Sequence, residues 1–412
     1  MEKPKKKEIR SMSEFPDELL LKMLNLLPTK DAVATSVLSK RWISLWKEMN
    51  AFRYDGDTVG RVYWGFALFI TKLLNLDSLD LKISPYSTNK YINYLVNIAV
   101  ARSLRKLRVE MVCGSFEFPK SLFIHSNLET VILEKVTLED PPLDARFVCL
   151  KSLHLLSVRF SSDESVETLL SRCPVLEDLV VRRSSFTNVM VFTIDVPTLR
   201  SLCVDNSVGE SRPEGVHGFV IRTPLLRWFS IKDRFSNYLR FEDMPELVKA
   251  SVSVVCESQP ELFLGSLAST QYLSLCSQTT YPPDGTSFLS LEHLELCSCS
   301  SEWWNLLTLI LNDAPRLRVL KLNLFQEHCV QHDGMVSWNK PSFVPECLSS
   351  HLEIFEWRQY KGTETEREAA KYILANGSHL KKAAFYSESA EKQGMLKELE
   401  CVARDSCTFV FE

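Results

Sequence analysis

Several common signatures are missing from this sequence. No apolar stretch approaches the roughly 18 residues that a membrane-spanning helix needs. The lysine-rich first residues are not followed by an apolar segment, so no secretory signal peptide is expected. The 13 glycines form neither a GxGxxG nor a GxxxxGK[ST] loop, and HExxH and GxSxG are also missing. These absences argue against a membrane-spanning or secreted protein and against the common nucleotide-binding and hydrolytic enzymes.

Charge and cysteine usage narrow the class further. The formal net charge is −4, which argues against a general nucleic-acid binder. The 12 cysteines are scattered, and only Cys297 and Cys299 lie close together. That pattern fits reduced thiols in the nucleus and/or cytoplasm better than a disulfide framework. No cysteine has a recognisable histidine or acidic partner, so no catalytic role is predicted.

Two short clusters have alternative interpretations. His328-Cys329 with His332 and Asp333 is the one group of metal-ligand type, but it has no second ligand pair, so no metal and no cofactor is predicted. The basic run from Lys3 to Arg10 is either a nuclear address or a solvated tail.

The most informative stretch is residues 15–46, which predicts three short helices. Pro16 suits a first helical turn, and Leu20, Leu24 and Leu27 recur at helical spacing before Pro28 ends the helix. Thr29 and Ser39 are expected to cap the second and third helices. Apolar side chains stand on more than one face, and helices this short cannot bury all of them. A partner surface is therefore expected to cover the surplus.

This segment resembles an F-box, the adaptor-docking module of cullin-based ubiquitin ligases. The resemblance rests on Phe15-Pro16-Asp17-Glu18-Leu19-Leu20, Leu27-Pro28-Thr29-Lys30-Asp31, Ser36-Val37-Leu38-Ser39-Lys40-Arg41-Trp42 and Leu45-Trp46. It implies docking on a Skp-family adaptor and, through it, on a cullin. The residues expected to contact the adaptor, or to hold the contact helices, are Phe15, Pro16, Leu19, Leu20, Leu24, Leu27, Pro28, Val33, Leu38 and Trp42. The alternative is that these helices only cap the repeats that follow.

From Leu76 onward the chain repeats itself. Residues 54–57 predict a polar connection, and residues 66–74 an amphipathic helix. The pattern Leu-x-x-apolar-x-apolar then recurs, mostly at intervals of about 21 to 28 residues, which is typical of leucine-rich repeats. Its units begin at Leu76, Leu104, Leu128, Leu150, Leu176, Leu199, Leu226, Leu247, Thr270, Leu291, Leu317, Leu352 and Leu380. Helical returns are expected between the strands, for example from Glu302 to Leu311.

Alternation along a strand separates two faces of each repeat. Positions four and six of the pattern should point into the core, and positions three and five should point outward. The outward positions carry no single sign of charge, which argues against a groove that follows phosphates. Trp228, Tyr272 and His293 occupy outward positions in the middle of the array and should lie near one another if successive strands stack. They are predicted to bind a target protein, unless loops cover them as ordinary packing.

The segment from Trp338 onward resembles the FBD domain of plant F-box proteins. The resemblance rests on Trp338, Val344-Pro345, Cys347-Leu348, Leu352-Glu353, Phe355, Trp357, Tyr360, Gly362, Glu366, Ala370 and Tyr372-Ile373-Leu374. Gly362 is expected to form a turn, and Thr363 with Glu366 a capping box at the start of a helix. Residues from 388 onward match least clearly.

The sequence therefore predicts an α/β protein: an N-terminal three-helix F-box, an irregular leucine-rich-repeat solenoid shaped as a horseshoe, and a C-terminal FBD cap. The predicted parts are a disordered basic tail (1–12), the F-box (13–50), the repeats (60–337) and the FBD domain (338–412). The resemblance implies a non-catalytic substrate receptor of a Skp–cullin–F-box ubiquitin ligase that binds an unidentified target protein and neither nucleic acid nor membrane. The alternative is an interaction scaffold that causes no degradation.

Overall fold

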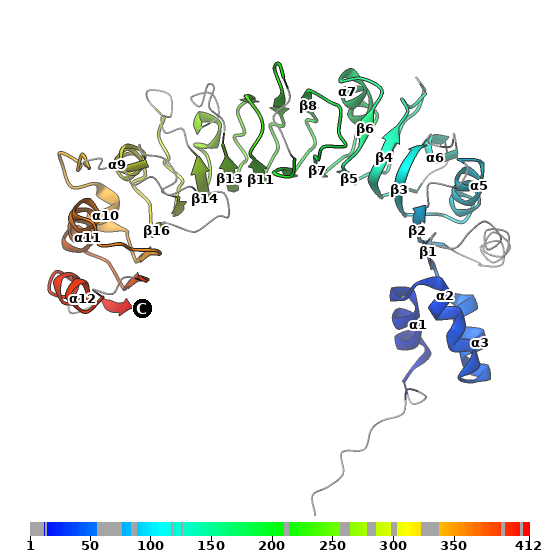
Figure 1. The fold of residues 1–412 in the computed structure, drawn as a ribbon, viewed down its shortest axis with the longest axis horizontal. Helices are drawn as coiled ribbons and strands as arrows, with labels where there is room; N and C mark the ends of the chain where they lie inside the picture. The colour runs from blue at the N-terminus through cyan, green and yellow to red at the C-terminus, as the bar shows by residue number, and fades with distance from the viewer. Residues whose placement is uncertain are drawn as a thin grey trace, which may run out of the picture. The chain divides into compact units, whose positions relative to one another are not determined.

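The computed structural model describes most of the chain in two compact units. The described residues are 12, 15–55, 76–83, 89–116, 119, 121–124, 127–142, 144–209, 214–255, 264–277, 286–297, 303–322, 338–388, 392–403 and 407–412. Unit 1 comprises Met1–Ser161 with Arg172–Val175, and unit 2 comprises Ser162–Ser171 with Leu176–Glu412. Figure 1 shows the described helices and strands in chain order by colour. The predicted helix at 66–74, the basic run at 3–10 and the histidine cluster at 328–333 lie outside the described residues.

Unit 1 begins with the three predicted helices. They are α1 (Asp17–Leu26), α2 (Thr29–Ala34) and α3 (Lys40–Leu45), with short 3₁₀ turns at Thr35–Val37 and Trp46–Glu48. α1 follows Pro16 and carries acidic residues in its first turn, where they complement the positive helix end. The expected side-chain caps are wrong. Ser39 precedes α3 without a capping hydrogen bond, and Thr29 lies inside α2, after Pro28.

Thr29 instead fastens the helices to the first strand, β1 (Ala51–Asp55). Its fully buried hydroxyl accepts a hydrogen bond from the backbone N–H of Arg53 at 2.8 Å. A second link runs through Asn25 and Asn50, whose side-chain amides are 2.8 Å apart, and continues from Asn50 to Asp77 at 2.6 Å. The predicted polar connection at 54–57 is therefore partly wrong, because its first two residues belong to β1.

The rest of unit 1 is a parallel sheet in the order β1-β2-β3-β4-β5, with helices between some of its strands. Its elements are β2 (Ser78–Ile83), α5 (Asn89–Val100), β3 (Lys106–Phe116), α6 (Ser121–Ile124), β4 (Thr130–Leu138), β5 (Ser152–Leu156) and β6 (Arg159–Phe160), which pairs with β4. Position four of each predicted repeat lies beside position four of the next, as in Leu79, Leu107, Val131 and Leu153. All four are buried, as the alternation predicts.

Unit 2 contains the later repeats, whose strands are also parallel. Its main sheet contains β7 (Asp178–Arg182), β9 (Ser201–Asn206), β11 (Trp228–Asp233), β13 (Lys249–Val254), β14 (Tyr272–Ser277), β15 (His293–Leu296), β16 (Val319–Leu322), β17 (Ile354–Trp357), β18 (Lys382–Phe385) and β19 (Thr408–Phe411). The residues at positions one, four and six of its predicted repeats are buried throughout. Because each unit hides its apolar edge only against its neighbours, the strands must stay in register.

The returns between strands are not all helical. Helices α7 (Glu164–Ser171) and α9 (Trp303–Asp313) agree with the prediction, and α9 buries the apolar face expected between residues 302 and 311. Between β7 and β13, however, the returns are strands β8 (Val191–Asp195), β10 (Gly218–Arg222) and β12 (Tyr238–Phe241), which form a separate parallel sheet in the order β12-β10-β8. The prediction of helical returns is wrong there, because these segments are short and rich in β-branched and aromatic residues.

The last repeats of unit 2 enclose an aromatic core. Trp357 is fully buried and packs edge-on against Trp303 and Tyr360, with ring centroids 6.3 and 5.2 Å away. The helices here are α10 (Glu346–Ser350), α11 (Glu364–Asn376) and α12 (Lys392–Glu400). The predicted capping box of Thr363 and Glu366 is present at the start of α11, and Gly362 adopts the left-handed φ of +69° that the turn requires.

Candidate functional site

The three N-terminal helices have one buried face and one exposed apolar face. Their core consists of Leu20, Leu24, Ala32, Trp42, Leu45 and Met49, with Phe15, Leu21 and Trp46 packed against it. Arg41 braces this core by donating hydrogen bonds to the Phe15 carbonyl and to Asp17. The candidate residues Leu20, Leu24 and Trp42 therefore hold the helices together, and Phe15 and Val33 are only half-buried.

The other candidates remain exposed. Leu19, Leu27 and Leu38 keep 46%, 39% and 61% of their surface in solvent, and Pro16 and Pro28 are also exposed. The structure adds exposed apolar residues that the sequence reasoning did not select, namely Met23, Leu26, Val37 and Ile43. Leu19, Met23 and Leu26 stand at i, i+4 and i+7, so they form one stripe along α1, which we call the α1 face. This stripe is the candidate docking surface of the N-terminal helices.

The second candidate region is the outward side of β11 to β15 in unit 2. Hydrogen-bonded register places Trp228 beside Lys249, Lys249 beside Tyr272, and Tyr272 beside His293. Tyr272 and His293 stack with ring centroids 4.3 Å apart, whereas Trp228 is separated from them by Lys249 and keeps 59% of its surface exposed. The structure thus brings two of the three predicted residues into contact and inserts a lysine before the third.

Lys249 is the residue of this row that the sequence reasoning missed. Its Nζ lies 4.2 Å from the centroid of the Tyr272 ring and 5.6 Å from that of Trp228, within the range of a cation–π interaction. It could have been found from the sequence, because it occupies position three of the repeat between those of Trp228 and Tyr272 and so lies in the same row. We call Trp228, Lys249, Tyr272 and His293 the aromatic row.

A charged cluster adjoins the aromatic row. Glu295 Oε1 lies 3.0 Å from His293 Nε2 and 3.3 Å from Lys321 Nζ. Burial raises the pKa of the Glu295 carboxyl, but hydrogen bonds from His293, Tyr272 and Lys321 outweigh it and bring that pKa down to about 2. Burial and the hydrogen bond to Glu295 also raise the pKa of Tyr272. The carboxylate charge is neutralised within the cluster, so the cluster holds Tyr272 and His293 in position and presents no unpaired carboxylate to a ligand.

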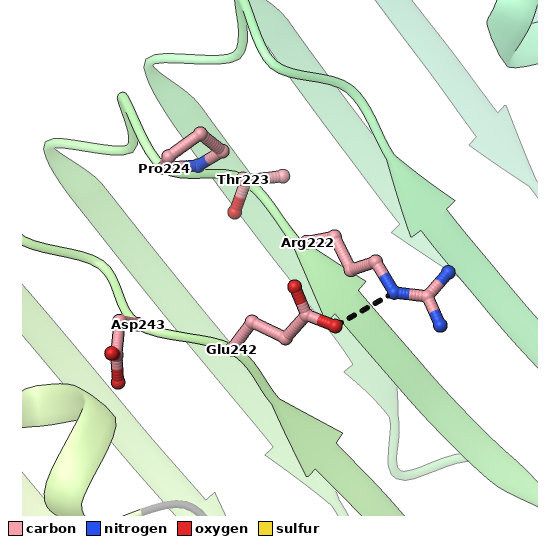
Figure 2. A pocket seen from close by; sticks show the side chains of 5 residues that line it. All are labelled: Arg222, Thr223, Pro224, Glu242 and Asp243. Atoms are coloured by element: carbon pink, nitrogen blue, oxygen red, sulfur yellow. Dashed lines mark hydrogen bonds and ion pairs between the residues drawn. The ribbon is translucent and has the colours of Figure 1, made fainter.

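A shallow hollow lies elsewhere in unit 2, at the ends of β10 and β12. Figure 2 shows its lining residues Arg222, Thr223, Pro224, Glu242 and Asp243. Arg222 Nε is 2.8 Å from Glu242 Oε1, and Arg222 Nη1 is 3.6 Å from Asp195 Oδ2. The guanidinium is therefore paired with two carboxylates and is not available as an anion site.

Neither a metal cluster nor a membrane-spanning helix is found in the described part of the chain. No three histidine, cysteine or acidic side chains gather there in a way that could hold a metal ion. No described helix combines the length and apolar character needed to cross a bilayer. Cys297 is buried, and Cys299 lies outside the described residues.

Comparison with known proteins matches three family models to three parts of the chain. The F-box domain model matches residues 12–54, the model of the LRR repeats of FBD-associated F-box protein At5g56370 matches residues 95–234, and the FBD model matches residues 340–385. The matched segments contain the α1 face, part of the repeats with Trp228, and the capping box of α11, respectively.

Curated relatives match almost the whole length. The chain is 53% identical over 396 residues to the FBD-associated F-box protein At1g50980 of Arabidopsis thaliana, covering 95% of this chain and 88% of that protein. It is 44% identical to the FBD-associated F-box protein At5g56560, covering 97% and 99%, and 39% identical to the F-box/FBD/LRR-repeat protein At5g56420, covering 96% and 97%, both of the same plant.

Proposed function

Because the chain belongs to the plant family of F-box proteins with leucine-rich repeats and an FBD domain, we propose that it is the substrate-recognition subunit of a Skp–cullin–F-box ubiquitin ligase. In this role the N-terminal helices dock a Skp-family adaptor, and through it a cullin, while the repeats bind a target protein in the nucleus and/or cytoplasm. The chain itself supplies no catalytic group. It brings the target close to the ubiquitin-transfer machinery, so that an encounter in solution becomes a tethered reaction.

The observation that carries this proposal is the division of the F-box side chains into two sets. One set, Leu20, Leu24 and Trp42, is buried in the internal core. The other set, the α1 face of Leu19, Met23 and Leu26, stays exposed to solvent. A segment that only capped the repeats would hide apolar surface rather than add it. An α-helical apolar stripe is suited to lie in the groove of a helical partner.

The test uses the full chain in plant cells with the proteasome blocked. The wild type is compared with an α1-face variant, Leu19→Gln/Met23→Gln/Leu26→Gln, and with Leu225→Gln, a matched change of an exposed leucine in unit 2. We expect proteins captured by the wild type and by Leu225→Gln to carry ubiquitin, and those captured by the α1-face variant to lack it. After release of the block, the same proteins should live longer with the α1-face variant. Equal ubiquitination and equal lifetimes for all three chains would instead indicate a scaffold without degradative function.

A further inference from the structure

Most charged side chains on the outward side of the described strands are paired. In unit 1, Arg108 contacts Asp80 at 3.7 Å and Glu134 at 2.7 Å. In unit 2, Lys321 contacts Glu295 at 3.3 Å, and Arg358 contacts Glu356 at 2.8 Å. Such pairing across neighbouring strands neutralises the surface. Cations that remain unpaired on this surface therefore stand out.

Three cations lie close to Trp228 along the chain or across the ladder: Arg227 directly precedes it, Arg200 holds the equivalent place before β9, and Lys249 is its register partner on β13. No ion pair within 4.0 Å to a described carboxylate is found for any of the three. Arg200 and Arg227 are exposed and occupy equivalent positions on adjacent repeats, since the Arg200 carbonyl accepts hydrogen bonds from the N–H groups of Arg227 and Trp228 at 2.9 and 3.0 Å. Like charges on neighbouring strands are unfavourable unless something compensates them. Lys249 is held in place by the two aromatic rings that flank it.

Only side chains are available for binding at the aromatic row. The N–H groups of β11, β13 and β14 are committed to the parallel ladder. Ser230, Ser251 and Ser274 line the next row, so the floor beside the aromatic row is low and polar. Phosphate groups are commonly bound by converging backbone N–H groups at a helix start or by several basic forks. Here single cations stand apart from one another beside the exposed indole of Trp228. This arrangement suits a partner whose carboxylates lie on either side of an apolar side chain.

An exposed carboxylate next to His293 favours a short acidic segment over a long polyanion. Glu292 directly precedes β15 and is exposed, so RNA that ran along the whole row would meet a like charge there. From Ser201 to His293 the row crosses five strands, or about 19 Å at the usual strand spacing, which about six residues of extended peptide can span.

We propose that the aromatic row, together with Arg200 and Arg227, binds an extended acidic segment of the target protein through carboxylates of Asp or Glu and an apolar side chain that packs on Trp228. This inference rests on the proposed function, because it specifies the chemistry of the target. The carboxylates pair with the three cations, and the apolar side chain covers the exposed indole. The neutralised Glu295 cluster holds Tyr272 and His293 in place at the end of the segment.

The test measures binding of fluorescein-labelled peptides of about ten residues to the purified full chain by fluorescence anisotropy. In the first peptide Glu alternates with Leu and Phe, in the second Gln replaces Glu, and in the third phosphoserine replaces Glu. We expect the Glu peptide to bind about tenfold or more tightly than the Gln peptide and to weaken as salt is raised. Equal affinity of the Glu and Gln peptides, or binding of the phosphoserine peptide alone, would overturn the proposal.

Variants locate the binding surface. Trp228→Ala and Lys249→Gln should each weaken the Glu peptide about tenfold, and Arg200→Gln/Arg227→Gln about fivefold or more. The matched control is Lys381→Gln, which removes an exposed cation of unit 2 that already pairs with Glu353 at 2.8 Å and should change the affinity less than about twofold. Wild-type affinity in all three test variants would refute this placement. Unchanged thermal unfolding of each variant shows that the changes act on the surface.

A parallel measurement separates this inference from the proposed function. The same protein preparations are tested for co-elution with a purified Skp-type adaptor. Retained adaptor binding with no peptide binding overturns the acidic-segment inference alone. Peptide binding that depends on Trp228, in a chain that does not bind the adaptor, supports the inference and counts against the ligase assignment.

Discussion

Replacing the α1 face with glutamine should abolish tight adaptor binding while leaving the F-box folded. Leu19, Met23 and Leu26 expose 46%, 44% and 73% of their surface, which together amounts to about one and a half free side chains. Burying a whole Leu or Met side chain contributes about 1.5–3 kcal/mol. If an adaptor covers all three, they contribute about 2–5 kcal/mol to binding. The dissociation constant should therefore rise between about thirtyfold and a few thousandfold.

The same change should have little effect on folding. All three side chains already lie in solvent, and glutamine has a helix propensity close to that of leucine and methionine. Each substitution should alter the free energy of unfolding by no more than about 0.5 kcal/mol. By contrast, Leu20→Ala or Leu24→Ala empties the buried core and should cost about 2–5 kcal/mol. Those variants would lose adaptor binding because the helices unfold.

The assay is titration calorimetry with a purified Skp-type adaptor, with hydrogen exchange of the α1 amides measured in parallel. The α1-face variant should keep protected amides and lose affinity, whereas Leu20→Ala should lose both. Leu289→Gln, a change of a 61% exposed residue in unit 2, serves as the surface control and should bind like the wild type. An α1-face variant with protected amides and wild-type affinity would refute the assignment of this stripe as the docking surface.

Three further predictions concern other parts of the chain. Gly362→Ala forces a non-glycine residue into φ +69° and makes its Cβ clash with Met395 Sδ, so it should lower the free energy of unfolding by about 1–3 kcal/mol. A smaller loss is expected in a Met395→Ala background, and denaturant unfolding monitored in the FBD segment checks both. Thr29→Val removes the acceptor of the Arg53 N–H, which should cost about 1–3 kcal/mol and speed exchange of that amide, a result that an unchanged exchange rate would contradict. Because the pKa of Glu295 is lowered from 4.5 to about 2, its ionised form stabilises the fold above pH 4.5, and this stability is lost as the pH falls toward 2. Glu295→Gln should therefore reduce the loss of unfolding free energy between pH 4.5 and pH 2, and an unchanged loss would show that the cluster does not stabilise the fold.

The regular parts of the fold follow from sequence because they depend on local periodicity. Apolar residues at positions four and six of each repeat can be buried only if the strands stack in register, so the pattern predicts the parallel ladder. The capping box of Thr363 and Glu366 and the turn at Gly362 are equally local, and the structure confirms them. Strand β19, however, has no leading leucine, and it is formed because its backbone pairs with β18. Pairing of that kind is decided by neighbours distant in sequence.

The candidate sites were only partly predictable for the same reason. Leu19 and Leu20 have the same chemical character, yet one lies in solvent and the other in the core, and only the packing of the three helices separates them. Helical spacing alone could not choose between these adjacent faces. Trp228, Tyr272 and His293 were selected from the outward positions of the repeats, but the role of Lys249 becomes visible only when its ammonium is found between two rings. Which residues bind the adaptor or a target stays a prediction.

The attachment of the N-terminal helices to β1 has a consequence for how force and direction are transmitted within unit 1. Only Met49 and Asn50 lie between the last 3₁₀ turn and β1; the first is buried and the second is hydrogen-bonded on both sides. This junction is rigid, so a protein bound to the helices would also have a fixed orientation relative to the first strand. Inserting a few glycines there would leave the α1 face and β1 intact but would remove the fixed orientation of the helices against the first strand.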